Sequence, residues 1–184
     1  MGDQPVKVGI LGLGNVGSAV VRLLQEDARR LPAVVGRHLE IGPVLVRDAT
    51  RPRLVPGGVE ITVDPDRVLE DPDVRVIVEL MGGIEPAVSY MLRALRAGKA
   101  VVTANKEAVA YRGQELLEAA HLAGVPLRFE ASVAGAIPII RVLKQSLVSD
   151  RLLEVAGIVN GTSNFVLGLM GQGYDLEEAV ELAR

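Results

Sequence analysis

The stretch VKVGILGLGNVG, residues 6–17, decides the fold of this 184-residue chain. Its first half, Val6–Leu11, is a short run rich in β-branched residues, which is typical of a buried strand. Its second half carries glycines at positions 12, 14 and 17, and apolar residues then recur at helical spacing as far as Leu31. Pro32 is expected to end that helix. A strand, a G-x-G-x-x-G turn and a helix in this order favour a site for the pyrophosphate of a dinucleotide.

The three glycines of this turn have different physical roles. Gly12 permits the tight turn, Gly14 lets the backbone approach a pyrophosphate, and Gly17 lets the helix pack closely on the strand. The N-terminus of the following helix directs unpaired N–H groups at the phosphates. We therefore predict that Gly12, Gly14 and Gly17 form the cofactor-binding turn.

The rest of the chain repeats the alternation of strand and helix. Apolar runs predict strands over residues 44–46, 74–80, 100–104 and 126–132. Helical patterns between them predict helices over residues 64–70, 85–97 and 113–123, and a Pro/Gly-rich loop is expected over residues 51–58. This alternation predicts an α/β protein with a Rossmann-like, doubly wound parallel sheet that is covered on both faces.

The alternation ends near Ser132, where we place the boundary of the nucleotide-binding domain. The predicted domains are therefore residues 1–132 and residues 133–184. The second segment predicts a helix that starts at Pro138, a strand over residues 152–160, and a last helix. Asp175 is expected to cap that last helix, with Glu178 completing a capping box.

Composition excludes several classes of function. The formal net charge is −3, aromatic residues make up 3% of the chain and there is no basic tail, so no nucleic-acid partner is expected. The chain has no cysteine, which excludes disulfides, thiolate metal sites and a cysteine nucleophile. His38 and His121 are far apart, which disfavours a zinc site. No apolar run approaches the roughly 18 residues of a membrane span, and no signal peptide is visible, so we expect a cytoplasmic protein without a membrane partner.

Charged residues after the second predicted strand bear on the choice of cofactor. An NAD site usually has an acidic residue there to hold the ribose 2′-hydroxyl, whereas an arginine suits a 2′-phosphate. Here Arg47 lies at the strand end, Asp48 is beside it, and Arg51 and Arg53 follow. The pattern favours NADP and places Arg47 in the cofactor site, while Asp48 leaves NAD open.

Polar residues also follow two other predicted strands, in ELMGG (residues 79–83) and TANKEA (residues 103–108). In doubly wound folds the ligand binds beyond the carboxyl ends of the strands. We therefore expect the polar residues at these two exits to face the nicotinamide half of the cleft.

Five stretches together resemble the homoserine dehydrogenase family. They are GLGNVG, VIVELMGGIEPA, GKAVVTANKEAVA, FEASVAGAIPII and GIVNGTSNFVLGLM, in the family's order and at similar spacing. Three positions depart from the usual pattern: Ala136 stands where glycine is frequent, Ser163 where threonine is common and Phe165 where tyrosine is common. None of these changes removes a charge or a proposed ligand.

The resemblance implies NAD(P)-dependent interconversion of L-homoserine and L-aspartate 4-semialdehyde, in the biosynthesis of threonine, methionine and isoleucine. It implies that residues 133–184 begin an α+β catalytic and dimerisation domain, and that the full-length enzyme is a homodimer. It also implies roles for particular residues. Leu13, Asn15 and Val16 are expected to contact the cofactor, and Thr103 and Lys106 to lie by the nicotinamide and substrate. Asn160, Gly161 and Thr162 are expected near the substrate, and a sodium-like monovalent cation is expected to be bound by Glu130 with backbone oxygens of Val133, Gly135 and Ile137.

The chemistry of the residues agrees with this expectation. Hydride transfer to an aldehyde leaves negative charge on its oxygen, and a cation at about 4 Å offers a Coulomb attraction of roughly 4 kcal/mol at an effective dielectric of 20. Lys106 is our candidate for that catalytic cation or for a proton donor. A positive charge at a helix start is disfavoured by the helix dipole, which favours a functional reason for it. Carboxylate and carbonyl oxygens such as those around Glu130 suit a hard cation.

Alternatives remain open at this point. The family continues beyond the last matching stretch with an acidic segment and a lysine, so we expect this chain to be a fragment or incomplete, and to bind cofactor without turnover by itself. A non-catalytic module that binds NADP(H) or senses its redox state is the second hypothesis. Aspartate-semialdehyde dehydrogenase chemistry is excluded because it needs a cysteine, and sugar-type oxidoreductases favour a Lys-Pro pair where this chain has Lys106 and Glu107.

Overall fold

The computed structural model describes residues 4–53, 58–158 and 160–183. The chain divides into two compact units, Met1–Ser132 and Val133–Arg184. Leu54–Gly57, in the expected Pro/Gly-rich loop, lie outside the described residues.

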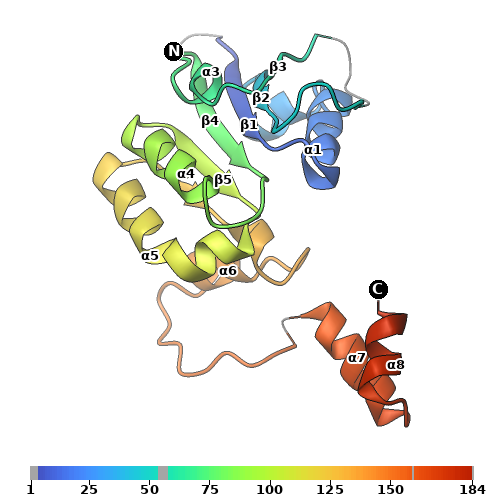
Figure 1. Ribbon diagram of the computed structural model, residues 1–184. Coiled ribbons are helices and arrows are strands. Elements are labelled where there is room, and N and C mark those ends of the chain that lie inside the picture. Colours follow the sequence, from blue (N-terminus) through green and yellow to red (C-terminus); the bar gives the residue numbers. More distant parts are fainter. Residues whose placement is uncertain (1–3, 54–57, 159, 184) are drawn as a thin grey trace. The chain divides into compact units, whose positions relative to one another are not determined.

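The first unit is built on a six-stranded sheet in the order β3-β2-β1-β4-β5-β6 (Figure 1). All neighbouring strands pair in parallel. The strands are β1 Val6–Leu11, β2 Leu39–Leu45, β3 Ile61–Thr62, β4 Val74–Glu79, β5 Ala100–Thr103 and β6 Leu127–Arg128. This order confirms the predicted doubly wound, Rossmann-like class, in which the order of strand addition reverses between β1 and β4.

Helices cover both faces of this sheet. They are α1 Asn15–Glu26, α2 Leu31–Val35, α3 Asp66–Leu69, α4 Ala87–Arg96 and α5 Lys106–Ala123. One buried cluster joins the sheet to α3, α4 and α5, and a second cluster joins the other side of β1 and β2 to α1. Alternate residues of β1 divide between them, since Ile10 belongs to the second cluster and Leu11 to the first.

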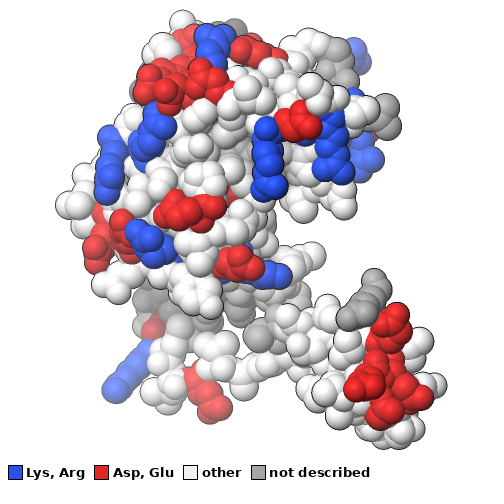
Figure 2. All heavy atoms as spheres, viewed as in Figure 1, with Lys and Arg blue, Asp and Glu red and all other residues white. Residues whose placement is uncertain are grey.

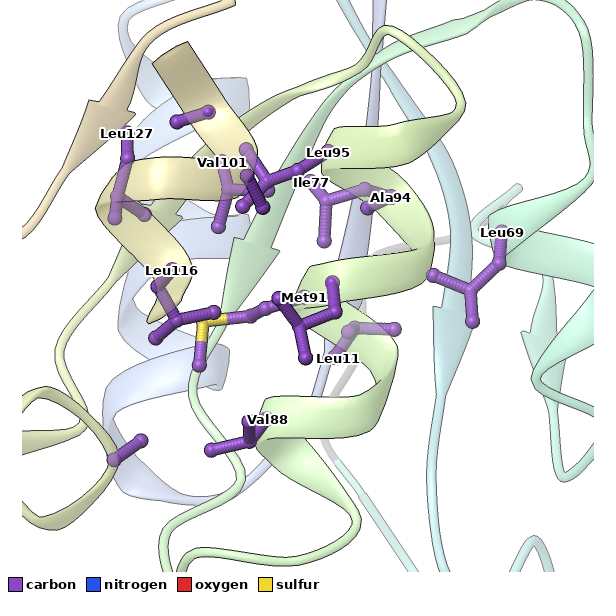
Figure 3. Close-up of a cluster of buried hydrophobic side chains, with 14 of the residues drawn as sticks. Leu11, Leu69, Ile77, Val88, Met91, Ala94, Leu95, Val101, Leu116 and Leu127 are labelled. Atoms are coloured by element: carbon purple, nitrogen blue, oxygen red, sulfur yellow. The ribbon is translucent and has the colours of Figure 1, made fainter. Parts of the chain in front are cut away.

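The larger cluster forms the main core (Figure 3). Ile77 of β4, Val101 of β5, Met91 and Leu95 of α4 and Leu116 of α5 are all 0% exposed. Their side chains meet between the two helices and the sheet, so the burial of α4 against the central strands positions the carboxyl edge of the sheet.

Three boundaries in this unit differ from the sequence predictions. The first helix ends at Glu26, and Pro32 occupies the first turn of the separate helix α2, where its missing N–H is tolerated. Strand β2 continues through Pro43, because the register between β1 and β2 shifts at this point and a bulge tolerates proline. Helix α5 begins at Lys106, well before the predicted residue 113, and a non-helical Arg112 interrupts it.

The predicted strand over residues 126–132 is wrong beyond its first residues. Strand β6 contains only Leu127–Arg128, and Glu130–Ser132 form the short 3-10 helix η1. Strand β6 pairs with β5 at Leu127 and Arg128, and the chain then turns, since the Ser132 N–H donates to the Phe129 carbonyl at 3.0 Å.

The second unit contains α6 Ile139–Arg141, the π-helical segment η2 Val142–Ser146, α7 Gly161–Gly171 and α8 Leu176–Leu182. A helix after Pro138 is thus confirmed, as is the capping box of Asp175 and Glu178. The predicted strand over residues 152–160 is wrong: residues 151–158 and 160 have no regular structure, and Val159 lies outside the described residues. A strand needs a hydrogen-bonded neighbour, and the described part of this unit contains no other strand.

Within the described ranges, none of the helices combines the length and the apolar character that crossing a membrane requires.

The core predicts a matched pair of mutations. Leu95→Ala removes a side chain that is 0% exposed, whereas Leu122→Ala removes the same atoms from a site on α5 that is 86% exposed. We expect Leu95→Ala to lower the free energy of unfolding by about 2–5 kcal/mol through the cavity it leaves. We expect Leu122→Ala to change it by less than about 0.5 kcal/mol. Urea unfolding followed by circular dichroism measures both, and equal losses would contradict the assignment of this core.

Candidate functional site

A cleft of about 710 Å³ lies at the carboxyl edge of the sheet, where β1, β2 and β4 end. The glycine turn, the arginine-rich segment after β2 and the residues after β4 all contribute to it. Its lining consists of Gly12, Leu13, Gly14, Leu45, Val46, Arg47, Asp48, Arg51, Arg53, Val63, Leu80, Met81, Pro86 and Tyr90. This is the edge at which doubly wound folds bind their ligands.

The glycine turn is held by the strands on each side of it. The Gly12 N–H donates to the carbonyl of Leu45 at 2.9 Å, and the Leu80 N–H donates to the carbonyl of Leu11 at 2.7 Å. Gly12 has φ +100°, and a Cβ there would lie 2.7 Å from the Leu80 carbonyl oxygen. A Cβ on Gly17 would lie 2.2 Å from the Gly12 carbonyl oxygen. Both positions therefore require glycine.

Gly14 differs from its two neighbours, because a Cβ there would meet no atom within 4 Å. It is the N-cap of α1, it makes no side-chain cap, and the first turn of that helix contains no acidic residue. Asn15, Val16 and Gly17 form this turn, so their N–H groups lie at the positive end of the helix dipole. The open space at Gly14 and this helix start together form a cradle that suits an anion.

The segment after β2 adds positive charge to the cleft. Arg53 donates from Nη1 to the carbonyl oxygens of Asp48 and Arg51, at 2.7 and 2.9 Å, and thereby shapes the loop. The guanidinium groups of Arg47 and Arg51 form no hydrogen bond or ion pair with any described residue. On the face seen in Figure 2, basic side chains gather around α1 and the segment after β2. The predicted place of Arg47 in the cleft is consistent with this lining.

Asp48 is engaged by its own loop. Its Oδ1 accepts hydrogen bonds from the Thr50 hydroxyl at 2.7 Å and from the Thr50 N–H at 2.8 Å. These bonds, with the nearby charge of Arg53, lower the pKa of Asp48 below its ordinary value. Asp48 therefore remains ionised in the cleft, with one oxygen used by Thr50.

The polar residues at the exits of β4 and β5 do not face the cleft as expected. Glu79 and Thr103 are 0% exposed and Asn105 is 5% exposed. The Thr103 hydroxyl donates to Glu79 Oε2 at 2.6 Å, and Asn105 Nδ2 donates to the Gly83 carbonyl at 2.6 Å. The expectation is wrong for these side chains because a buried carboxylate at the end of β4 supplies their acceptor. A contact of Thr103 with the cofactor stays a prediction.

Lys106 is the one member of this polar segment predicted to be catalytic, and its side chain is exposed. It is the first residue of α5, directly after Asn105, whose Oδ1 accepts from the Ala108 N–H and caps the helix. Its ammonium forms no hydrogen bond or ion pair with any residue in the described ranges. It is therefore available to a ligand, at the helix end where its charge is least favoured.

The remaining predicted site residues lie at the end of the first unit and in the second unit. Glu130 is half-buried in η1, and the predicted backbone ligands follow it at Val133, Gly135 and Ile137. Asn160 caps α7 through a 2.8 Å bond from the Ser163 N–H, and Gly161 and Thr162 form the first turn of that helix. Their places at a cation and at the substrate stay predictions.

Two lining residues were missed from the sequence. Val63 and Tyr90 line the cleft, although no motif marks them. Val63 directly follows β3, whereas Tyr90 lies within α4. For Val63 the only available signal was its position just beyond a strand end.

Comparison with protein families finds two matches. The model described as "Homoserine dehydrogenase, NAD binding domain" matches residues 12–130, and the model described as "Homoserine dehydrogenase" matches residues 138–184. Among curated relatives, the homoserine dehydrogenase of Synechocystis sp. is 44% identical over 181 residues, which are 97% of this chain and 41% of that protein. That of Mycobacterium tuberculosis is 50% identical over 169 residues, which are 91% of this chain and 38% of that protein. The chain thus spans about two fifths of the length of these relatives.

Solved structures give the same result. A homoserine dehydrogenase from Thiobacillus denitrificans superposes with a TM-score of 0.91 at 40% identity, over 98% of this chain and 42% of that one. A hyperthermophilic archaeal homoserine dehydrogenase in complex with NADPH superposes with a TM-score of 0.82 at 25% identity, over 98% of this chain and 60% of that one.

The glycine geometry predicts that two similar mutations act differently. Gly14→Ala adds a methyl group to open space at φ −83°, so stability should be nearly unchanged, while the methyl group obstructs the approach of a pyrophosphate. We expect its affinity for NADPH to fall about tenfold or more, which is about 1.4 kcal/mol. Gly17→Ala places a methyl group against the Gly12 carbonyl and should lower the thermal unfolding temperature itself.

Fluorescence titration with NADPH and thermal unfolding of the same samples separate the two effects. Tight binding by a stable Gly14→Ala variant would show that phosphates do not bind at this turn.

Proposed function

Since this chain belongs to the homoserine dehydrogenase family, we propose that it binds a nicotinamide dinucleotide in the cleft at the carboxyl edge of the sheet and takes part in the interconversion of L-homoserine and L-aspartate 4-semialdehyde. The observation that carries the proposal is the glycine turn, with Gly14 open to the cleft and the uncapped start of α1 behind it. In this proposal residues 1–132 hold the cofactor and residues 133–184 begin the substrate-binding part. The cytoplasmic location expected from the sequence belongs to the same proposal.

NADP is the proposed cofactor in preference to NAD. Arg47 and Arg51 line the cleft, and their guanidinium groups have no partner among the described residues, so they are free to pair with a 2′-phosphate. One oxygen of Asp48, the acidic residue that would hold a ribose 2′-hydroxyl, is already engaged by Thr50. The structural neighbour that was solved with NADPH supports this preference.

Lys106 is proposed to act on the carbonyl oxygen of the substrate. A bound nicotinamide supplies or accepts the hydride at the substrate carbon. When the aldehyde is reduced, negative charge develops on its oxygen, and the Lys106 ammonium stabilises that charge or donates a proton to it. In the opposite direction the same group holds the charge of the alkoxide as the alcohol proton leaves.

Residues of the second segment complete the proposal. Asn160, Gly161 and Thr162 are proposed to contact the substrate from the start of α7. Glu130, with backbone oxygens of Val133, Gly135 and Ile137, is proposed to bind a sodium-like cation, because carboxylate and carbonyl oxygens are the ligands that such a cation prefers. The full-length protein is proposed to be a homodimer.

The arginine segment predicts a difference between two cofactors. Arg47→Ala should weaken NADPH binding by about 1.5–3 kcal/mol, the range for a hydrogen bond to a charged group, and leave NADH binding within about twofold. Arg96→Ala, which removes the same charge from the exposed end of α4, is the matched control. Titration calorimetry with both cofactors provides the measurement, and equal losses for NADPH and NADH would show that Arg47 does not read the 2′-phosphate.

The catalytic proposal predicts a separate effect at α5. In the full-length protein, Lys106→Ala should lower kcat for homoserine-dependent NADP reduction by roughly 10²–10³-fold, because a preorganised charge at the reacting oxygen is lost. NADPH affinity should stay within about twofold. Glu107→Ala, at the neighbouring exposed position, controls for disturbance of the helix start.

Steady-state kinetics and NADPH titration are run on both variants. Unchanged turnover in Lys106→Ala would remove this lysine from the mechanism. Tight NADPH binding without any homoserine-dependent reduction by the unmutated full-length protein would instead favour a binding or redox-sensing module.

A further inference from the structure

Glu79 is a fully buried carboxylate at the end of β4. Its Oε2 accepts from the Thr103 hydroxyl at 2.6 Å, and its Oε1 accepts from the Met81 N–H at 2.7 Å and, more weakly, from Asn105 Nδ2 at 3.5 Å. Among the described residues no cationic side chain forms an ion pair with it. A carboxylate buried without a cation is costly, so these three donors are what makes its presence possible.

The three donors belong to segments that meet at the paired ends of β4 and β5, where the Ala104 N–H also donates to the Glu79 carbonyl at 3.2 Å. Met81 lies in the wall of the cofactor cleft, Thr103 ends β5, and Asn105 precedes α5. Asn105 also donates to the Gly83 carbonyl at 2.6 Å, and the Thr103 oxygen accepts from the Asn105 N–H at 2.9 Å. One carboxylate therefore links the cleft wall after β4 to the first turn of α5.

The next residue after this network is Lys106. Its side chain is exposed and has no partner in the described part of the chain, so its ammonium depends for its position on the backbone from which it extends. That backbone is held on one side by the cap of α5 and on the other by the bonds of Asn105 to Gly83 and Glu79. Glu79 itself does not line the cleft.

We propose that Glu79 is a positioning residue, which through Thr103 and Asn105 sets where the Lys106 ammonium stands relative to the cofactor cleft. This inference rests on the proposed function, because it takes Lys106 to lie beside the nicotinamide. An apolar side chain would fill the same place in the core at lower cost. The buried carboxylate instead imposes directional bonds on two strand exits at once.

The test follows the accessibility of the Lys106 amine in the purified protein. Acetylation by an N-hydroxysuccinimide ester is measured by peptide mass spectrometry with and without saturating NADPH. Lys7, which is at the start of β1 and pairs with Asp71 at the amino edge of the sheet, is the internal reference. In the unmutated protein NADPH should slow acetylation of Lys106 relative to Lys7 roughly three- to tenfold, since a bound ligand buries most of the surface it touches.

Glu79→Gln keeps the size of the side chain but cannot accept from all three donors, because its amide nitrogen meets the Thr103 hydroxyl. We expect NADPH to bind this variant within about threefold of its normal affinity, because the glycine turn is intact. We expect the protection ratio of Lys106, which is its acetylation rate without NADPH divided by its rate with NADPH, to fall toward one. Asn105→Ser is a second variant for the case that Glu79→Gln does not fold: serine still caps α5, but the bond to Gly83 is lost, and protection should fall in the same way.

The control is Lys99→Met. Lys99 is 6% exposed and donates to the Asp71 carbonyl at the amino edge of the sheet, so its loss destabilises the same unit away from the cleft. It should lower the unfolding temperature while leaving the protection of Lys106 intact. If protection of Lys106 is also lost in Lys99→Met, lower stability alone explains the loss of protection in the Glu79 variant. That result would overturn the inference.

The remaining outcomes separate this inference from the proposed function. If NADPH protects Lys106 equally in the unmutated protein and in the folded variants, Glu79 does not position it, and the proposed function stands. If NADPH binds without protecting Lys106 in the unmutated protein, the lysine does not lie beside the nicotinamide. The proposed catalytic role of Lys106 and the positioning role of Glu79 are then both overturned.

Discussion

The close contact of two backbone segments at the end of β1 is the constraint on which the rest of the structure depends. The start of α1 lies so near the turn that a single methyl group on Gly17 would overlap the Gly12 carbonyl oxygen. This contact directs the N-terminus of α1 at the carboxyl edge of the sheet, where β2 and β4 flank the turn through bonds to Gly12 and Leu11. The anion cradle, the cleft and the reversal of the strand order all lie at this one place.

The two edges of the sheet are built differently. At the amino edge, Lys7 pairs with Asp71 and Lys99 donates to the Asp71 carbonyl, which closes the starts of β1, β4 and β5 with contacts local to that edge. Burial lowers the pKa of the Lys99 ammonium at this edge. At the carboxyl edge the polar groups form a connected network around Glu79, and this network adjoins the cleft. Directional bonds are thus concentrated where a ligand needs fixed geometry.

The second unit has a different balance of forces. Its helix α7 carries the apolar side chains Phe165, Leu167 and Met170, which are 49%, 65% and 40% exposed. Acidic side chains gather on α8 (Figure 2), where Glu177 and Glu178 lie in the first turn and suit the helix dipole. Its helices are therefore specified by caps and local patterns more than by a buried core of their own.

Local patterns in the sequence were sufficient for the class of fold, the glycine turn and the capped helix at Asp175, because each depends on residues close together in the chain. Arg47, expected at the end of the second strand, lines the cleft because strand ends in a parallel sheet meet at one edge, and its contact with the cofactor stays a prediction. The tertiary structure alone decided which side of a strand exit each polar residue faces. Thr103 and Asn105 turn inward because Glu79, 24 and 26 positions earlier, supplies a buried acceptor. It also decided against a strand over residues 152–160, since a strand forms only where another strand offers its N–H and C=O groups.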